Sequence, residues 1–544
     1  MRKTEVQMDP NSLEKNKMSS LQNCVSKSHL RRVSYRGILA GGGLFFLILY
    51  LSQGTTGVSD DLLFFANRDQ GKGEISFSPP LMLLATPFNF YFNAFFIQLF
   101  SLEKTFGLDL IKGVFLSFYV YCGYLFFQKY VSRATAIFGS FLFFFYPIHD
   151  GATYFFLAHY LLAGFAFYFL SLWLLQKKLW LAGFCAALIA SFTSYGSLPV
   201  ALGITAICLK ERNLRAAGCA LLPNLVYSIY FFIVTKGFGL GPQRLPDSWD
   251  GLLKSFGLQF LSSLDANLGI SSLLKIWSLL ESASPFVFIA GLLSSLLFFF
   301  SNSAEARTEQ GCRSSPCSLL VCAGIVYGCG LGILALTRAY PQVAFNLGNR
   351  VSIFGSFLVI CILLLVCEKR PRFLWVITPF YLICILSASQ HWKQWVAVQK
   401  GVVQILSRIP DANPVEGQLV ILAGPRYSRL GSFDHLEGAT ERWVCEKYFK
   451  LAFGGAVREV WPASSFLQPD DHFLFNAKTG ERREIKYPVM YVSLLDQSVQ
   501  QLQRKQLSET IKKISPDRRH WLQKLPARYR ETIANSFPRF RYLF

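Results

Sequence analysis

Two adjacent aspartates, Asp60 and Asp61, follow the first apolar segment of the chain in the sequence Gly-Val-Ser-Asp-Asp-Leu. Carboxylates at the rim of a membrane span lose hydration unless they meet water, a metal ion or a cationic side chain, so this pair is a candidate site. One carboxylate could accept a proton from a hydroxyl group while its neighbour raises its pKa or helps to hold a divalent cation. The simpler alternative is a pair of solvated loop acids, or a cap for the helix that begins near Leu62.

A histidine and a carboxylate, His149 and Asp150, lie in a short turn between two apolar segments. If both segments cross the membrane, the turn lies on the same face as Asp60 and Asp61. There it could complete an acidic site that gains and loses protons. The alternative is a polar turn in which Asp150 only caps the next helix.

Two arginines bracket a later turn, Arg338 before it and Arg350 after it. Guanidinium groups so placed make a fork suited to a phosphate or pyrophosphate. Alternatively, each arginine extends from the end of a span to a lipid phosphate and takes no part in a site. Lys236 and Arg244, at the start of a long polar loop covering residues 236–285, are weaker candidates for phosphate binding.

The composition is that of a membrane protein. Of 544 residues, 52% are hydrophobic and 16% are aromatic, and the mean hydropathy is +0.34. Several apolar stretches are long enough to span lipid, so we predict a multi-pass α-helical membrane protein.

The net charge of +21 could indicate a nucleic-acid partner. However, the basic residues fall in short clusters between apolar segments, which favours contact with membrane lipid and no nucleic acid.

About eleven transmembrane helices are expected. The apolar segments are 37–52, 110–127, 134–146, 152–175, 179–191, 198–209, 216–235, 286–300, 318–336, 351–367 and 373–386. With the basic tail 1–36 in the cytoplasm, every basic loop cluster also falls there, as the positive-inside bias requires. These clusters comprise Lys129, Arg133, Lys177, Lys178, Lys210, Arg212, Arg215, Arg307, Arg313, Lys369, Arg370 and Arg372. The absence of an Asn-x-Ser/Thr sequon favours a bacterial inner (plasma) membrane.

Residues 37–390 are therefore the expected transmembrane domain, and residues 391–544 the expected extracytoplasmic region. The latter begins with His391, Trp392 and Trp395, an aromatic and basic stretch typical of a membrane interface. Segments 418–422 and 489–494 have the composition of strands, and 472–481 that of a hairpin. This pattern predicts a small α+β domain with a basic helical tail.

This layout resembles the GT-C superfamily of polyprenyl-phosphate-sugar glycosyltransferases. The likeness covers residues 1–390 and rests on the order and common face of several features. They are an Asp-Asp pair after the first span, an aromatic segment led by Ser78-Pro79-Pro80-Leu81, the His149-Asp150 turn, an Arg350-Val351 entry to a late span and a soluble C-terminal domain. The resemblance implies that Asp60 or Asp61 is the catalytic carboxylate, that Asp150 is the second-loop acid and that Arg350 contacts the lipid phosphate. The histidine beside the second acid is a departure from that pattern.

The resemblance also implies an inverting transfer of a sugar from a polyprenyl-phosphate-linked donor to a glycan, lipid or protein acceptor on the extracytoplasmic face. The lipid phosphate is a good leaving group, so Arg350 and Arg338 would stabilise its departure while an aspartate deprotonates the acceptor. The sequence does not decide whether a divalent cation takes part. The alternatives are a polysaccharide polymerase or ligase, a lipid-linked sugar transporter or flippase, and a non-catalytic membrane scaffold.

Overall fold

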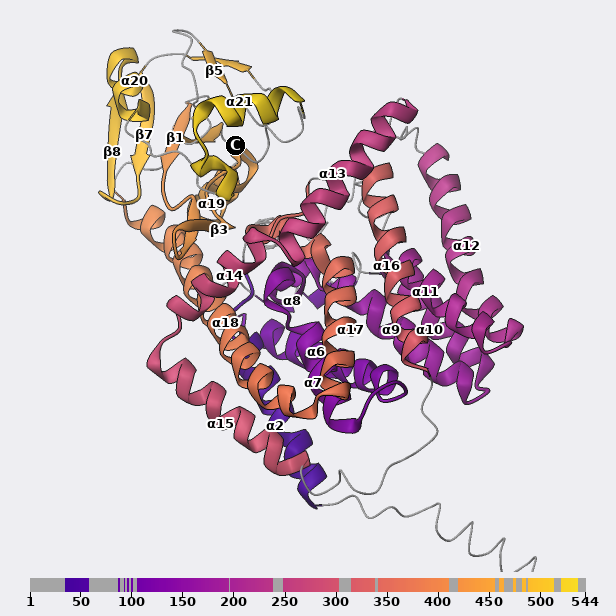
Figure 1. Cartoon of the computed structure of the whole chain (residues 1–544). Coiled ribbons are helices and arrows are strands. Elements are labelled where there is room, and N and C mark those ends of the chain that lie inside the picture. The colour runs from indigo at the N-terminus through magenta and orange to yellow at the C-terminus, as the bar shows by residue number, and fades with distance from the viewer. Residues whose placement is uncertain are drawn as a thin grey trace, which may run out of the picture.

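A bundle of apolar helices carries a small sheet domain at one end (Figure 1). The computed structural model describes residues 35–57, 87–88, 92, 95–96, 99–100, 105–194, 196–237, 248–302, 315–337, 341–409, 419–454, 459–463, 473–475, 482–485, 488–512 and 520–536. Within these ranges, the side chains of residues 35–40, 235–237, 301–302, 473–475, 482–483, 511–512, 534 and 536 are not described.

Ten of the eleven expected apolar segments each coincide with one helix, and the segment 152–175 is divided into two α-helices and the 3-10 helix between them. The helices are α2 (Tyr35–Ser52), α6 (Phe106–Phe127), α7 (Arg133–Phe144), α8 (Asp150–Tyr154), α9 (Tyr160–Gln176), α10 (Trp180–Thr193), α11 (Ser197–Lys210), α12 (Leu214–Gly237), α15 (Pro285–Asn302), α16 (Pro316–Leu336), α17 (Ile353–Lys369) and α18 (Pro371–Arg408). Short 3-10 helices η1 (Pro147–His149), η2 (Phe156–Ala158) and η3 (Leu347–Ser352) lie at breaks between them. Proline and serine mark several starts, as at Pro316, where the Ser315 hydroxyl accepts a hydrogen bond from the backbone of Cys317.

Six helices in the described part of the chain are long and apolar enough to cross a membrane, or up to seven if one bent pair forms a single span. The prediction of a multi-pass helical membrane protein is therefore confirmed. Helices α7, α10 and α11 have 12, 14 and 14 residues. At a rise of about 1.5 Å per residue they reach only about 18 to 21 Å, against a hydrocarbon core of about 30 Å. The number of about eleven spans stays a prediction.

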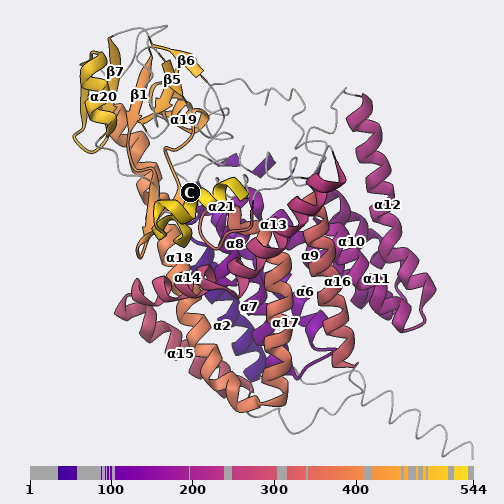
Figure 2. The same ribbon diagram turned by 45° about the horizontal axis from the view of Figure 1, so that its top comes forward.

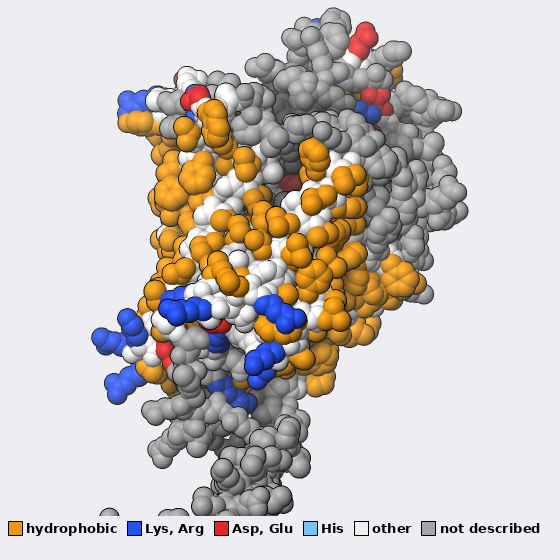
Figure 3. Space-filling view, turned by 90° about the vertical axis from the view of Figure 1, so that its right-hand side faces the viewer, with side chains coloured by type: hydrophobic (Ala, Val, Ile, Leu, Met, Phe, Trp, Pro, Cys, Tyr) orange, Lys and Arg blue, Asp and Glu red, His pale blue; other side chains and the backbone are white. Residues whose placement is uncertain are grey.

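The described basic loop clusters gather at one end of the bundle. Lys129, after α6, forms an ion pair with Glu211, after α11. The backbone N–H of Ser132, before α7, donates to Glu368, near the end of α17. Figure 3 shows lysine and arginine side chains below a broad apolar surface on one face of the molecule. These contacts confirm that the clusters share an end, whereas their cytoplasmic location stays a prediction.

The expected polar loop at 236–285 is wrong as a loop. Residues Trp249–Asn267 form helix α13 and residues Ile270–Glu281 form helix α14. Their apolar residues alternate with serines, glutamine and lysine at helical spacing, which lowers the mean hydropathy and hides the helices from a search for apolar runs. The segment Trp249–Glu281, which comprises α13 and α14, turns into α15 through a bend of 104°.

The C-terminal region contains strands and helices, as predicted, and four of the strands form a mixed sheet. Strand β1 (Val420–Ala423) is parallel to β4 (Val460–Pro462) on one side and to β7 (Val489–Ser493) on the other, and β8 (Ser498–Leu502) is antiparallel to β7. Helix α19 (Arg442–Phe453) precedes β4 and packs on it. The expected hairpin at 472–481 is formed by β5 (Phe473–Phe475) and β6 (Arg482–Glu484).

Two elements fasten the sheet domain to the bundle. Helix α18 continues without a break through residue 390, where the boundary was expected. A hairpin of β2 (Tyr427–Leu430) and β3 (Phe433–Glu437) returns to the bundle, where the Phe433 ring lies 4.8 Å from that of Phe345.

Because Trp392 and Trp395 are buried, their assignment to a membrane interface is wrong.

The last described residues also cross back over the bundle (Figure 2). They form α20 (Arg504–Lys512), η5 (Trp521–Lys524) and α21 (Ala527–Ser536), which agrees with a helical tail. His520 Nε2 lies 3.0 Å from an oxygen of Asp265 in α13. Trp521 Nε1 donates to both oxygens of Asp265 at 3.3 Å.

Candidate functional site

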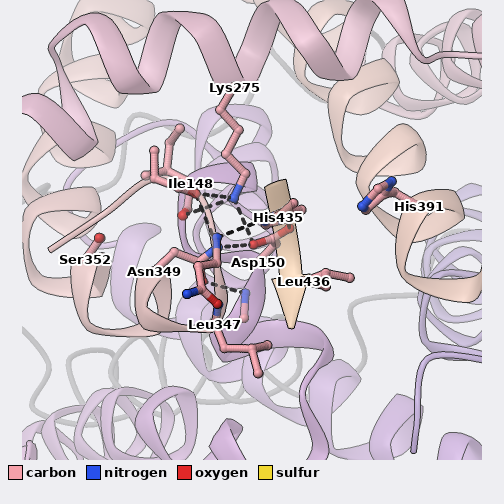
Figure 4. A network of polar contacts seen from close by, with 12 residues as sticks. Ile148, Asp150, Lys275, Leu347, Asn349, Ser352, His391, His435 and Leu436 are labelled. Atoms are coloured by element: carbon pink, nitrogen blue, oxygen red, sulfur yellow. Dashed lines mark hydrogen bonds and ion pairs between the residues drawn. The ribbon is translucent and has the colours of Figure 1, made fainter. Parts of the chain in front are cut away.

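The carboxylate of Asp150 is the centre of a buried polar network (Figure 4). Oδ1 accepts from Lys275 Nζ at 2.9 Å and from the amide of Asn349. Oδ2 accepts from Trp392 Nε1 at 3.0 Å and from His435 Nε2 at 2.9 Å. All four donors therefore come from side chains of this chain, two to each oxygen.

These donors belong to four separate elements of the fold: Lys275 to α14, Asn349 to η3, Trp392 to α18 and His435 to β3. Asp150 itself is the first residue of α8, directly after η1, which begins at Pro147. The alternative that Asp150 only caps the next helix is wrong, because α8 has no side-chain cap and the carboxylate bonds elsewhere. The network thus joins the membrane helices to the sheet domain through one carboxylate.

The partners of Asp150 are themselves held in place. Lys275 Nζ also donates to the carbonyl of Ala344 at 2.6 Å. Asn349 Oδ1 accepts from the backbone N–H of Gly151 at 2.9 Å. A Cβ added at Gly151 would stand 2.5 Å from that oxygen, so a side chain there would push η3 away. Close approach of α8 and η3 therefore requires the glycine that follows the acid.

The charges in the network favour an ionised aspartate and a neutral histidine. Burial alone would raise the pKa of Asp150, but Lys275 and His435 hold it well below its usual range. Burial lowers the pKa of His435, although Asp150 opposes the shift. His435 Nδ1 accepts from the backbone N–H of Asn346 at 3.1 Å, so Nε2 carries the proton that is donated to Asp150.

His149 is next to Asp150 in sequence but points elsewhere. Its Nε2 donates to the carbonyl of Phe143 at 2.9 Å, and its Nδ1 has no partner among the residues that the structure describes. Burial lowers the pKa of His149 to about 3, although the hydrogen bond to Phe143 opposes the shift. His149 is therefore a neutral packed residue that bonds to Phe143 rather than to the Asp150 carboxylate, which does not support the expected protonatable site at this turn.

Arg350 follows Asn349 in η3, so the structure brings the segments of Asp150 and Arg350 together as expected. Its guanidinium lies over the ring of Phe155, with Cζ 5.8 Å from the ring centroid. The side chain is half-buried, unlike the fully enclosed groups around Asp150. A partly accessible guanidinium beside an aromatic ring is a suitable partner for an anionic group.

A second buried cluster, absent from the sequence analysis, fixes the chain just before the first-loop aspartates. Asp109 in α6 accepts from Gly54 N at 2.8 Å and from the Thr56 hydroxyl at 2.6 Å. Lys112, one turn later, donates to Thr56 at 3.0 Å and to the carbonyl of Tyr154 at 3.2 Å. The end of α2, the start of α6 and the end of α8 are thereby joined.

The structure describes no side chain for the other candidates. Asp60, Asp61, Arg244 and Arg338 belong to ranges that the structure does not describe, and Lys236 lies in α12 with an undescribed side chain. In the described ranges, no group of three or more His, Cys, Asp and Glu side chains could hold a metal ion. Metal dependence therefore stays open.

Lys275, Trp392, His435, Asp109 and Lys112 were missed by the sequence analysis. Only two of them carried a usable signal: Asp109 and Lys112 are charged residues one turn apart at the start of an apolar helix, where unpaired charges are costly.

Three comparisons, with protein-family models, curated proteins and solved structures, found no match for this chain.

Proposed function

We propose that this protein is a membrane-embedded glycosyltransferase that takes a sugar from a polyprenyl-phosphate-linked donor and joins it to a glycan, lipid or protein acceptor. The observation that carries the proposal is the contact between Asp150 and the segment of Arg350. Asn349, next to Arg350, donates to the Asp150 carboxylate and accepts from Gly151 N. This contact supports a phosphate-binding cation held against the turn of Asp150, where the reaction needs positive charge to stabilise the leaving phosphate.

The end of the bundle that holds Asp150 is opposite the basic loops. Asp150 precedes α9, whereas Lys177 and Lys178 follow it. Arg350 precedes α17, and Lys369 ends it. In the proposed orientation the basic loops face the cytoplasm of a bacterial cell, because positive charge is retained there. The reaction then takes place on the extracytoplasmic face.

The chemistry is a single displacement with inversion. A bond forms between the acceptor oxygen and the anomeric carbon as the bond from that carbon to the phosphate oxygen breaks. Asp60 or Asp61 accepts the acceptor's proton, and polyprenyl phosphate leaves with its charge stabilised by Arg350. Arg338, Lys236 and Arg244 are further candidates for phosphate binding.

Asp150 has a positioning role in this proposal. Four donors already occupy its oxygens, and its low pKa makes it a poor proton acceptor. Its bond with Asn349 instead holds η3, and hence Arg350, against α8. An assay with and without a metal chelator tests separately whether a divalent cation takes part.

The experiment uses the full chain in lipid nanodiscs with a panel of polyprenyl-phosphate sugars and candidate acceptors. Mass spectrometry detects the glycosylated acceptor and the released polyprenyl phosphate. We expect Arg350→Ala to lower the rate by roughly 10²- to 10³-fold, the range for losing one group that stabilises transition-state charge. Arg372→Ala, an exposed arginine at the basic end of α18, is the matched control and keeps the rate.

Donor consumption that is equal in wild type and Arg350→Ala contradicts the proposed phosphate site. Donor that crosses the membrane with its glycosidic bond intact identifies a transporter instead. Absence of any bond cleavage across the panel rejects the glycosyltransferase for those donors.

A further inference from the structure

Helix α13 turns its apolar side outward and its polar side inward. The exposed apolar residues recur every three or four positions: Trp249, Leu253, Phe256, Phe260 and Leu264. The buried residues of the opposite side include Ser255, Gln259, Ser262, Ser263 and Asn267. This distribution is the reverse of that found in a helix that covers a protein core and faces water.

The polar side of α13 is bound to the membrane helices. Ser255 donates to the carbonyl of Ala335 in α16 at 3.0 Å. Ser356 in α17 donates to Asn267 Oδ1 at 2.9 Å. A Cβ added at Gly355 would stand 2.4 Å from Asn267 Nδ2, so the two helices meet closely there. The inward orientation of the polar residues is therefore fixed by specific contacts.

Helix α14 repeats the pattern. Leu273 and Trp277 point outward and are 64% and 66% exposed. Lys275, between them, is fully buried and bonds to Asp150. Two consecutive helices thus present apolar side chains to the outside and polar side chains to the protein.

We infer that the outward faces of α13 and α14 lie against the acyl chains of membrane lipid. Exposed aromatic and aliphatic side chains are unfavourable in water but cost nothing in a hydrocarbon environment. This inference concerns the lipid boundary and holds whether or not the protein transfers sugar.

Continuity with neighbouring apolar surface favours lipid as the occupant over a second protein. Helix α15, which follows α14, exposes Phe286, Ile289, Leu293, Leu297 and Phe300 along its whole length. Helix α16, which packs on α13, ends at the exposed Leu336. A protein partner would cover one patch, whereas a bilayer surrounds all of these helices at once.

The start of α13 has the character of a membrane surface. Trp249 is exposed there, and Asp250 and Lys254 form an exposed ion pair at 2.6 Å. Tryptophan and charged residues are enriched at the level of lipid headgroups. Helix α13 therefore begins at the headgroups and enters the hydrocarbon toward Phe260.

Spin labels on the full chain in phosphatidylcholine vesicles test the inference. Labels are attached at Phe260→Cys, Leu264→Cys and Leu273→Cys, and collision rates are measured with oxygen, which partitions into lipid, and with a water-soluble nickel chelate. Leu297→Cys, 70% exposed on α15, is the lipid reference, and Leu495→Cys, 87% exposed in the β7–β8 turn, is the water reference. Protein without the added cysteine gives the background from native cysteines.

We expect the three labels to show an oxygen-to-nickel collision ratio several-fold above that of Leu495→Cys and close to that of Leu297→Cys. A ratio close to that of Leu495→Cys means that α13 and α14 face water. Low collision rates with both reagents mean that a second copy or another protein segment covers them. Either result overturns the inference, and if one variant does not fold, the remaining two still decide.

Discussion

Asp150 and His435 are 285 residues apart in the chain, yet Oδ2 of the aspartate and Nε2 of the histidine are 2.9 Å apart. The aspartate begins a short helix of the membrane domain, and the histidine lies in a strand beside the sheet domain. Because both are buried, their hydrogen bond makes the β2–β3 hairpin part of the membrane domain's interior. The sheet domain is therefore mechanically linked to the candidate site.

Replacing His435 by alanine should destabilise the protein by about 1 to 3 kcal/mol, the range for leaving a buried polar group without its partner. We expect a lower midpoint of thermal unfolding in detergent, followed by tryptophan fluorescence. His435→Gln can still donate to Asp150 and should recover part of the loss. Gln500→Ala, at an exposed position of β8, is the control. An equal midpoint for His435→Ala and the control is the contrary result.

Breaking the Asp150–Lys275 ion pair from one side should cost about 3 to 5 kcal/mol, because the remaining charge is buried without its counter-charge. The double variant Asp150→Asn, Lys275→Met should lose less than the sum of the two single variants. Asp250 and Lys254 provide a matched pair, with side chains 71% and 74% exposed. Their exposed i,i+4 bridge should be worth only about 0.3 to 0.5 kcal/mol. Additive losses at Asp150 and Lys275 would contradict a coupled pair.

Acid should destabilise the protein partly through His149. Burial lowers its pKa from 6.5 to about 3, so the folded protein binds fewer protons here than the unfolded chain. The stabilising contribution is complete above pH 6.5 and is lost progressively as the pH falls toward 3. His149→Gln should therefore show a smaller drop in unfolding midpoint than wild type between pH of about 7 and about 5. An identical drop would show that His149 does not carry this acid sensitivity.

Gly355 tests the close packing of α17 on α13. A Cβ at this position would stand 2.4 Å from Asn267 Nδ2, so Gly355→Ala should cost about 1 to 3 kcal/mol through overpacking. Gly324→Ala in α16 is the control, because nothing lies within 4 Å of its Cβ position. The control should be neutral or slightly stabilising, since alanine favours helix. Similar unfolding midpoints for the two variants would contradict the described contact.

The fold was predictable where one physical signal dominated. Long apolar runs indicated the membrane helices, and short segments with the composition of strands indicated β1 and β7. Helices α13 and α14 were missed because their apolar residues are separated by buried polar ones, as in Leu253 to Phe260. Helical spacing of the aromatic residues was the signal that could have found them.

The site was predictable only in part. Asp150 and the segment of Arg350 could be assigned to the same face of the membrane, because the basic residues in the loops indicate which ends of the spans are cytoplasmic. The Asp150 partner Lys275 lies in helix α14, which was expected to be a loop. Trp392 lies in α18, at a position that was assigned to the membrane interface, and His435 lies in β3, far along the chain. No local pattern connects them, since tertiary packing alone brings them to one carboxylate.

Release of polyprenyl phosphate from a lipid-linked sugar by the full chain in nanodiscs is the most direct test of the proposed function. Wild type is compared with Asp60→Asn, Asp61→Asn and the double variant, and with Asp250→Asn, an exposed acid at the start of α13, as control. We predict that at least one single variant and the double variant lose about 10²-fold or more of the rate, as expected for a general base, while the control keeps it. A wild-type rate in the double variant would contradict the proposed mechanism.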